Sequence, residues 1–167
     1  MKYIFILVLC LQLQLYATEH SHEVSKANIS WGENLNLTLD ENGFSTTTKG
    51  LRVFGSFSLK DEDFRSILLY KNLRFPKHNM ILVRHNYTIY ILDLNKEEMI
   101  GEFKIPSRGT PSFIKIEPNE NGYTSLKTSF NILPKEPSDK KQPIGRPGPR
   151  ITTIMIYKDG KYIHLKK

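Results

Sequence analysis

The chain has 167 residues, 24 Lys and Arg against 17 Asp and Glu, a formal charge of +7, and one cysteine, Cys10. Cys10 lies in an amino-terminal segment that we expect to be removed, so the mature chain would contain no cysteine. This excludes a disulfide scaffold, a thiol nucleophile, and zinc or iron–sulfur sites that are built on cysteine.

Residues 1–17 have the pattern of a secretory signal peptide. Lys2 supplies the positive start, an apolar stretch continues to Leu11, and Ala17 is the small residue required before the cleavage point. The apolar stretch is much shorter than the roughly 20 residues of a membrane span. We therefore expect cleavage after Ala17, secretion to the extracellular side, and no transmembrane anchor.

Cleavage after Ala17 would create a new amino terminus with a metal-binding pattern. The segment Thr18-Glu19-His20 would offer a free amine, two backbone amides and a third-position imidazole. Four such nitrogens suit square-planar Cu(II) or Ni(II). The alternative is a histidine placed by chance in a polar terminus, and we expect no other cofactor.

Three Asn-x-Ser/Thr sequons begin at Asn28, Asn36 and Asn86. In a secreted chain these asparagines are acceptors for N-glycosylation. Leucines alternate with polar residues around Asn36, which predicts that Asn36 faces solvent on a half-buried strand. Asn86 lies in a predicted turn, so both positions are compatible with a glycan.

Alternating side chains and turn signals predict a neutral, β-rich globular domain over residues 18–134. Asn-Gly pairs at 42–43 and 121–122 predict hairpin turns, and Gly55 predicts a bulge or a close contact. The strands are expected at residues 35–39, 44–48, 51–57, 80–83, 87–94, 99–105 and 113–116. The predicted core residues are Leu35, Leu37, Leu39, Phe57, Phe64, Leu68, Leu82, Ile89, Ile91, Phe103, Ile114 and Ile154.

One segment, residues 59–72, changes from strand to helix periodicity. Phe64, Ile67 and Leu68 recur at helical spacing, and Ser58 followed by Asp61 resembles a capping box. The sequence therefore predicts a mainly β fold, an antiparallel β-sandwich or open barrel, with one short amphipathic helix packed on it.

The composition changes after Pro134. Five of the nine prolines lie between Pro134 and Pro149, which predicts that residues 135–150 are an extended, basic connection. Residues 151–167 then predict a basic β-hairpin that turns at Asp159-Gly160. This hairpin would either close the main sheet or stand apart from it.

The positive charge is confined to this carboxyl-terminal part. Residues 18–134 hold 14 bases and 14 acids, whereas residues 135–167 hold nine bases and three acids. Such an excess outside the cell favours a glycosaminoglycan or an anionic surface as partner, whereas a solvated tail is the alternative. Nucleic acid is not expected, because the sequence has no motif for it. The nine candidate polyanion-binding bases are Lys135, Lys140, Lys141, Arg146, Arg150, Lys158, Lys161, Lys166 and Lys167.

The sequence gives no support for catalysis. It has no Gly-x-Ser-x-Gly elbow, no His-Glu-x-x-His zinc pattern and no Gly-rich phosphate loop. We interpret the chain as a secreted, non-catalytic glycoprotein that binds an extracellular protein, a glycosaminoglycan or an anionic surface, in defence, reproduction or parasite–host contact. The alternatives are a glycan-acting enzyme with a carboxylate pair, and a precursor that is cut at Lys140-Lys141 to release a cationic peptide.

Overall fold

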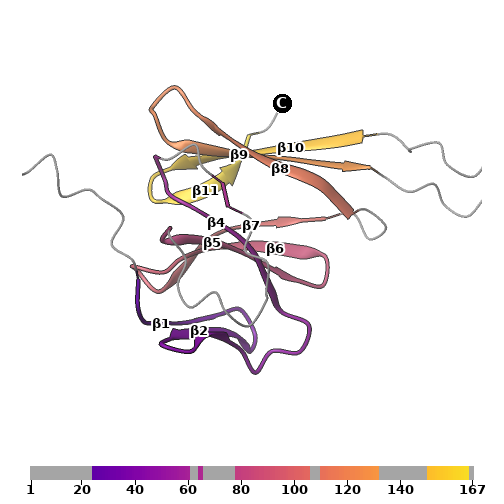
Figure 1. Cartoon of the computed structure of the whole chain (residues 1–167). Coiled ribbons are helices and arrows are strands. Elements are labelled where there is room, and N and C mark those ends of the chain that lie inside the picture. Colours follow the sequence, from indigo (N-terminus) through magenta and orange to yellow (C-terminus); the bar gives the residue numbers. More distant parts are fainter. Residues whose placement is uncertain (1–23, 61–63, 66–77, 106–109, 132–149, 166–167) are drawn as a thin grey trace, which may run out of the picture.

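The computed structural model describes residues 24–60, 64–65, 78–105, 110–131 and 150–165, and within them eleven strands form three antiparallel sheets (Figure 1). The first sheet has the order β1 (Ala27–Trp31), β2 (Leu35–Asp40), β3 (Gly43–Ser45). The second has the order β4 (Arg52–Phe57), β5 (Met80–His85), β6 (Thr88–Asp93), β7 (Glu98–Lys104). The third has the order β11 (Lys161–His164), β10 (Arg150–Lys158), β9 (Thr124–Asn131), β8 (Thr110–Pro118).

The three sheets are stacked, with the second sheet between the other two (Figure 1). None of them closes into a barrel. The prediction of a mainly β, antiparallel fold is confirmed, and of the two architectures expected the sandwich is the one observed. The stack has two hydrophobic cores, one on each face of the second sheet.

Strand β5 shows why the middle sheet can separate two cores. Ile81 and Val83 belong to the core shared with the first sheet, whereas Met80 and Leu82 belong to the core shared with the third. Successive side chains of a strand point to opposite faces. A strand that is buried on both faces therefore needs an uninterrupted apolar run, as β5 has.

The core below the middle sheet is built on a strictly alternating hairpin. Every second residue of β1 and β2 is buried and the residues between them are exposed or half-buried. The ring of Trp31 meets the ring of Tyr90 edge-on, with centroids 5.5 Å apart. The backbone N–H of Asn28 also donates to the carboxylate of Glu97 at 3.0 Å, which ties β1 to the turn after β6.

The core above the middle sheet brings β11 against β7. Gly101 of β7 leaves the space that Tyr162 of β11 occupies. The Tyr162 hydroxyl donates to the backbone carbonyl of Thr124 at 2.9 Å, and its ring contacts Phe57 edge-on. Burial raises the pKa of Tyr162, so this hydroxyl stays protonated as a donor.

The predicted helix at residues 59–72 is wrong where the structure describes it. Leu59 and Lys60 form a turn, and Arg65 pairs with Ser56 of β4 through two backbone hydrogen bonds of 2.9 and 3.0 Å. The ring of Phe64 packs over Gly55, where any side chain would collide with it. This packing aligns Arg65 beside β4 in an extended conformation, which a helix cannot provide. The rest of the segment, residues 61–63 and 66–72, lies outside the described residues.

The other core and turn predictions have mixed outcomes. Gly55 follows a register shift in the β4–β5 pair, which confirms both the bulge and the close contact predicted there. Ile154 was expected in the core, but it lies on the outer face of the third sheet because its neighbour Met155 points inward. Leu68 lies outside the described residues. The remaining predicted core residues are buried or pack against the two cores.

The carboxyl-terminal hairpin belongs to the main fold. Strand β10 pairs with β9 over Arg150–Met155, and β11 pairs with the other edge of β10. Of the two arrangements left open by the sequence, the hairpin therefore extends the sheet of β8 and β9. Residues 1–17, the copper candidates Thr18, Glu19 and His20, and residues 135–149 lie outside the described residues.

Candidate functional site

The candidate polyanion-binding residues that the structure describes lie on the last hairpin. Lys158 and Lys161 face each other across its turn, where Asp159 and Gly160 have positive φ angles of 51° and 82°. Both lysines are exposed, and in the part of the chain that the structure describes neither forms an ion pair. Arg150 opens β10. The other candidate bases, Lys135, Lys140, Lys141, Arg146, Lys166 and Lys167, lie outside the described residues.

An aliphatic surface that the sequence did not reveal lies beside these lysines. It consists of Ile154, Ile156, Ile163 and Leu165, which we call the outer aliphatic patch. Ile156 pairs with Ile163, and the N–H of Leu165 donates to the carbonyl of Ile154 at 2.9 Å, so the four side chains form two adjacent pairs. Ile163 is 43% exposed and Leu165 is 47% exposed.

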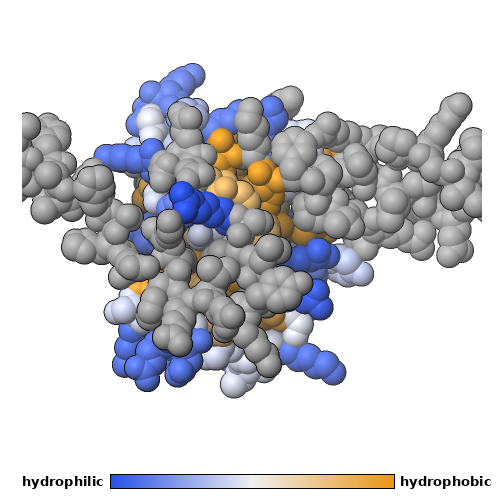
Figure 2. Space-filling view, viewed as in Figure 1, coloured by the Kyte–Doolittle hydropathy of each residue, from blue (hydrophilic) through white to orange (hydrophobic). Residues whose placement is uncertain are grey.

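The patch lies on the outer face of the third sheet. Met155 and Tyr162, which alternate with the patch residues along β10 and β11, are buried in the core between the second and third sheets. Neighbouring side chains of a strand point to opposite faces, so the patch points away from that core. Figure 2, in the orientation of Figure 1, views the sheets from the side and shows apolar side chains at the level of the third sheet, with hydrophilic ones above them.

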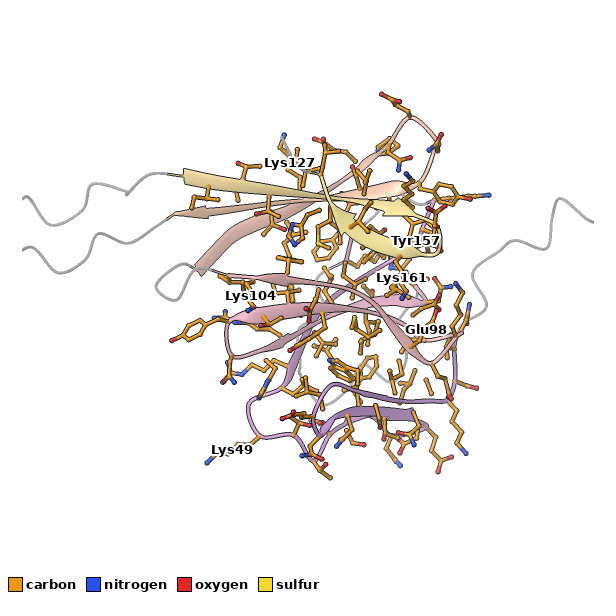
Figure 3. All side chains as sticks on the ribbon, turned by 180° about the vertical axis from the view of Figure 1, so that it is seen from behind. Lys49, Glu98, Lys104, Lys127, Tyr157 and Lys161 are labelled. Atoms are coloured by element: carbon orange, nitrogen blue, oxygen red, sulfur yellow. The ribbon has the colours of Figure 1, made fainter. Side chains whose placement is uncertain are left out.

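Lysines lie on two sides of the patch. Lys127 of β9 pairs with Ile154 and so lies beside the patch on the neighbouring strand, whereas the Lys158–Lys161 pair follows Ile156 and Ile163 along the hairpin. Figure 3 labels Lys127 and Lys161 on their strands, β9 and β11. Within residues 150–165 the hairpin has one acidic residue, Asp159, which lies in its turn. The face therefore combines exposed aliphatic carbon with cationic groups.

The first two sequons lie side by side on the outer face of the first sheet. Strands β1 and β2 pair so that Asn28 is opposite Thr38 and Ser30 is opposite Asn36. The asparagine of each sequon thus faces the hydroxyl residue of the other. The hydroxyl of Thr38 lies 3.3 Å from the side-chain oxygen of Asn28, which shows how closely the two sequons approach.

The three acceptor asparagines differ in their surroundings. Asn28 is exposed, and Asn86 is exposed at the tip of the β5–β6 hairpin with a φ of 52°. Asn36 is half-buried, and its side-chain nitrogen donates to the hydroxyl of Thr47 at 2.7 Å. The backbone N–H of Thr47 returns a bond of 3.1 Å to the side-chain oxygen of Asn36. The carboxamide of Asn36 thus holds the loop after β3.

When the chain is expressed through a secretory pathway, we expect it to carry glycans on Asn28 and Asn86 and to leave Asn36 unmodified. A glycan on Asn36 would compete with its bond to Thr47, and diagonal residues on paired strands are only about 7–8 Å apart, which crowds a second glycan beside Asn28. Glycopeptide mass spectrometry measures the occupancy. Asn28→Gln and Asn86→Gln should each remove one glycan, whereas Asn36→Gln should remove none. Full occupancy of Asn36 would contradict the expectation.

A buried serine–histidine pair joins the edge of β4 to the start of β5. The Ser56 hydroxyl lies 3.2 Å from Nδ1 of His78, and the two residues are 2% and 6% exposed. A histidine can activate a serine hydroxyl for nucleophilic attack. Here the burial keeps the hydroxyl from a substrate, so the pair serves packing. The two residues are 22 positions apart in the sequence, which explains why no sequence motif indicated the pair.

Neither of two hollows that are lined by described residues contains a facing carboxylate pair. One, of about 680 Å³, is lined by uncharged residues of the β1–β2 turn and by Thr47. Another, of about 440 Å³, contains Asp40 and Glu41, but these are adjacent in a turn and Asp40 accepts the N–H of Asn42 at 2.7 Å. A glycosidase needs two carboxylates that flank a bond.

The buried carboxylate of Asp93 also has a structural role. It accepts the N–H groups of Asn95 and Lys96 at 3.0 and 3.2 Å and so holds the turn between β6 and β7. Burial raises the pKa of Asp93 above its ordinary value, and these two N–H groups offset part of that rise. Within the described residues no group of three His, Cys, Asp or Glu could hold a metal ion.

Comparison of the chain with protein-family models, curated proteins and solved structures finds no match in any of the three. The described residues contain no helix that is long and apolar enough to cross a membrane.

Proposed function

We propose that the chain is a secreted, N-glycosylated binding protein without catalytic activity, whose basic carboxyl-terminal part engages a polyanionic partner at an extracellular surface. The observation that carries this proposal is the position of Lys158 and Lys161, which are exposed and side by side at the end of the β10–β11 hairpin.

The pairing of this hairpin supports a binding role over that of a solvated tail. Strand β10 forms a continuous antiparallel pair with β9, so the lysines are attached to a folded sheet. Cationic groups that are held in place lose less conformational freedom on binding than those of a loose tail. Lys127 adds a third base on the same sheet.

Heparin affinity chromatography tests the proposal. Deletion of residues 135–167 is unsuitable, because it would remove β10 and β11 from the third sheet. Point variants are therefore required. We expect the unmodified chain to elute well above physiological salt, and Lys158→Ala/Lys161→Ala to elute earlier, because each phosphate- or sulfate-pairing base increases the salt dependence of binding.

A matched control removes the same charge elsewhere. Lys49 and Lys104 are both exposed. Lys49 lies between β3 and β4, Lys104 is the last residue of β7, and both are apart from the third sheet (Figure 3). Lys49→Ala/Lys104→Ala should elute close to the unmodified chain. Elution of the unmodified chain at low salt, or equal losses in the two double variants, would contradict the proposal.

A further inference from the structure

We propose that the anionic partner is a phospholipid bilayer, and that the outer face of the third sheet is the surface that lies on it. This inference rests on the proposed function and makes its partner specific. It is carried by the outer aliphatic patch, which lies between Lys127 and the Lys158–Lys161 pair on the same face.

Aliphatic side chains distinguish a bilayer from other polyanions. A glycosaminoglycan offers sulfates, carboxylates and hydroxyls, and gains little from contact with isoleucine or leucine. A bilayer with anionic lipids offers both hydrocarbon and negative head groups. Single exposed apolar residues are common on soluble proteins, but a contiguous apolar surface rimmed by polar groups is typical of an interaction site. Ile154, Ile156, Ile163 and Leu165 are contiguous on two paired strands.

The geometry of the sheet places aliphatic side chains and lysines close enough together to contact the acyl chains and the head groups of a bilayer at the same time. Alternate residues of a strand are about 6.6 Å apart and paired strands about 4.8 Å apart. The patch is therefore two residues long and two strands wide, with Lys127 beside it on β9 and the Lys158–Lys161 pair beyond its end at the hairpin turn. Lysine side chains bury their alkyl stems against apolar surface and extend their charged ends outward. Lys127, Lys158 and Lys161 can thus reach head groups while the patch contacts acyl chains.

The position of the patch at a sheet edge keeps it accessible. Strand β11 is the last strand of the third sheet on that side, and its inner side chain Tyr162 is fixed against Gly101 of β7. The outer side chain Ile163 is therefore held outward by the packing of its neighbour. The next two residues of the sequence, Lys166 and Lys167, lie outside the described residues.

Co-sedimentation of the purified chain with lipid vesicles tests the inference. One set of vesicles contains phosphatidylcholine alone, and the other contains about 30% phosphatidylserine, at about physiological salt. We expect binding to the anionic vesicles and little binding to the neutral ones. Lys158→Ala/Lys161→Ala should weaken binding by about thirtyfold, since each lysine near an anionic membrane lowers the dissociation constant about fivefold.

The aliphatic variant provides the decisive readout. Ile163→Ser/Leu165→Ser should weaken vesicle binding at least tenfold and leave elution from heparin unchanged, because it removes apolar area and no charge. Tyr87→Ser is the matched control, since Tyr87 is also exposed, at 52%, but lies on the β5–β6 hairpin. Far-UV circular dichroism and the unfolding midpoint establish that each variant is folded.

The outcomes separate this inference from the proposed function. Heparin binding without vesicle binding would preserve the proposed function and overturn the lipid inference, whereas loss of both would overturn both. Equal vesicle binding by the unmodified chain and Ile163→Ser/Leu165→Ser would overturn the inference for this face. The chain could instead form a dimer that does not bind vesicles and that dissociates in Ile163→Ser/Leu165→Ser. That result would assign the patch to self-association and would also overturn the lipid inference.

Discussion

Replacement of Ile81 by alanine, and separately of its neighbour Leu82, should each lower the free energy of unfolding by about 2–5 kcal/mol. Both side chains are 0% exposed, yet they point to opposite faces of β5 and belong to different cores. In a two-layer sandwich one of two adjacent strand residues faces solvent, and its substitution changes stability by about 0.5 kcal/mol or less. Two large losses at adjacent positions are therefore a signature of a sheet that is buried on both faces.

Urea unfolding followed by the fluorescence of Trp31, the only tryptophan, measures both losses. The control is a pair of adjacent residues on a strand with one solvent face. Leu37→Ala should be strongly destabilising, because Leu37 is 2% exposed, whereas Thr38→Ala on the outer face should change stability little. A loss above about 1 kcal/mol at only one of Ile81 and Leu82 would contradict the three-layer arrangement.

Most of the strands were predictable because their signals are local, although β1 and β9 were not among the strands expected. The β5–β6–β7 meander follows from short runs of apolar and β-branched residues separated by turn residues. The number of layers was not predictable in the same way. A continuous apolar run such as residues 80–83 identifies a strand, but it does not say which other strands cover its two faces. That depends on pairings between segments far apart in the chain.

The two Asn-Gly pairs, at residues 42–43 and 121–122, are alike in sequence but lie in loops of different length. At the first, Asp40 pairs with Gly43, so the loop consists of the two residues between them and the glycine begins β3 with a φ of 105°. At the second, Gly122 lies inside a longer loop, in which the Asn119 side chain accepts the N–H groups of Asn121 and Tyr123. Strand register, which is set by the packing of each hairpin, decides between the two loops.

Most of the candidate site could not be predicted from the sequence, because the pairing register of β9, β10 and β11 determines which side chains share a face. Apolar residues occur on both faces of strand β10. Alternation alone therefore does not indicate that Met155 faces the core and Ile154 faces outward. The prediction of Ile154 as a core residue was wrong for this reason, and the same error concealed the outer aliphatic patch. The charge of the carboxyl-terminal part was visible in composition, but its juxtaposition with aliphatic carbon required the pairing of β10 with β11.

Gly101→Ala should lower the free energy of unfolding by about 1–3 kcal/mol, and it should loosen β11 before the rest of the fold. A Cβ atom at this position would lie 2.6 Å from the Cβ of Tyr162 and 3.3 Å from its carbonyl oxygen. Both are anchored close to the backbone, so no side-chain rotation relieves the collision. Strand β11 would have to move away from β7, which weakens the bond from the Tyr162 hydroxyl to Thr124.

Amide hydrogen exchange combined with urea unfolding distinguishes this local effect from a general loss of stability. The amides of Tyr162 and Ile163 should exchange faster in Gly101→Ala, while those of β1 and β2 keep their protection. Glu102→Ala is the matched control, because Glu102 is the next residue of β7 and its side chain is exposed. If Gly101→Ala and Glu102→Ala had equal stability and equal exchange at β11, Gly101 would not be the contact that positions the outer aliphatic patch.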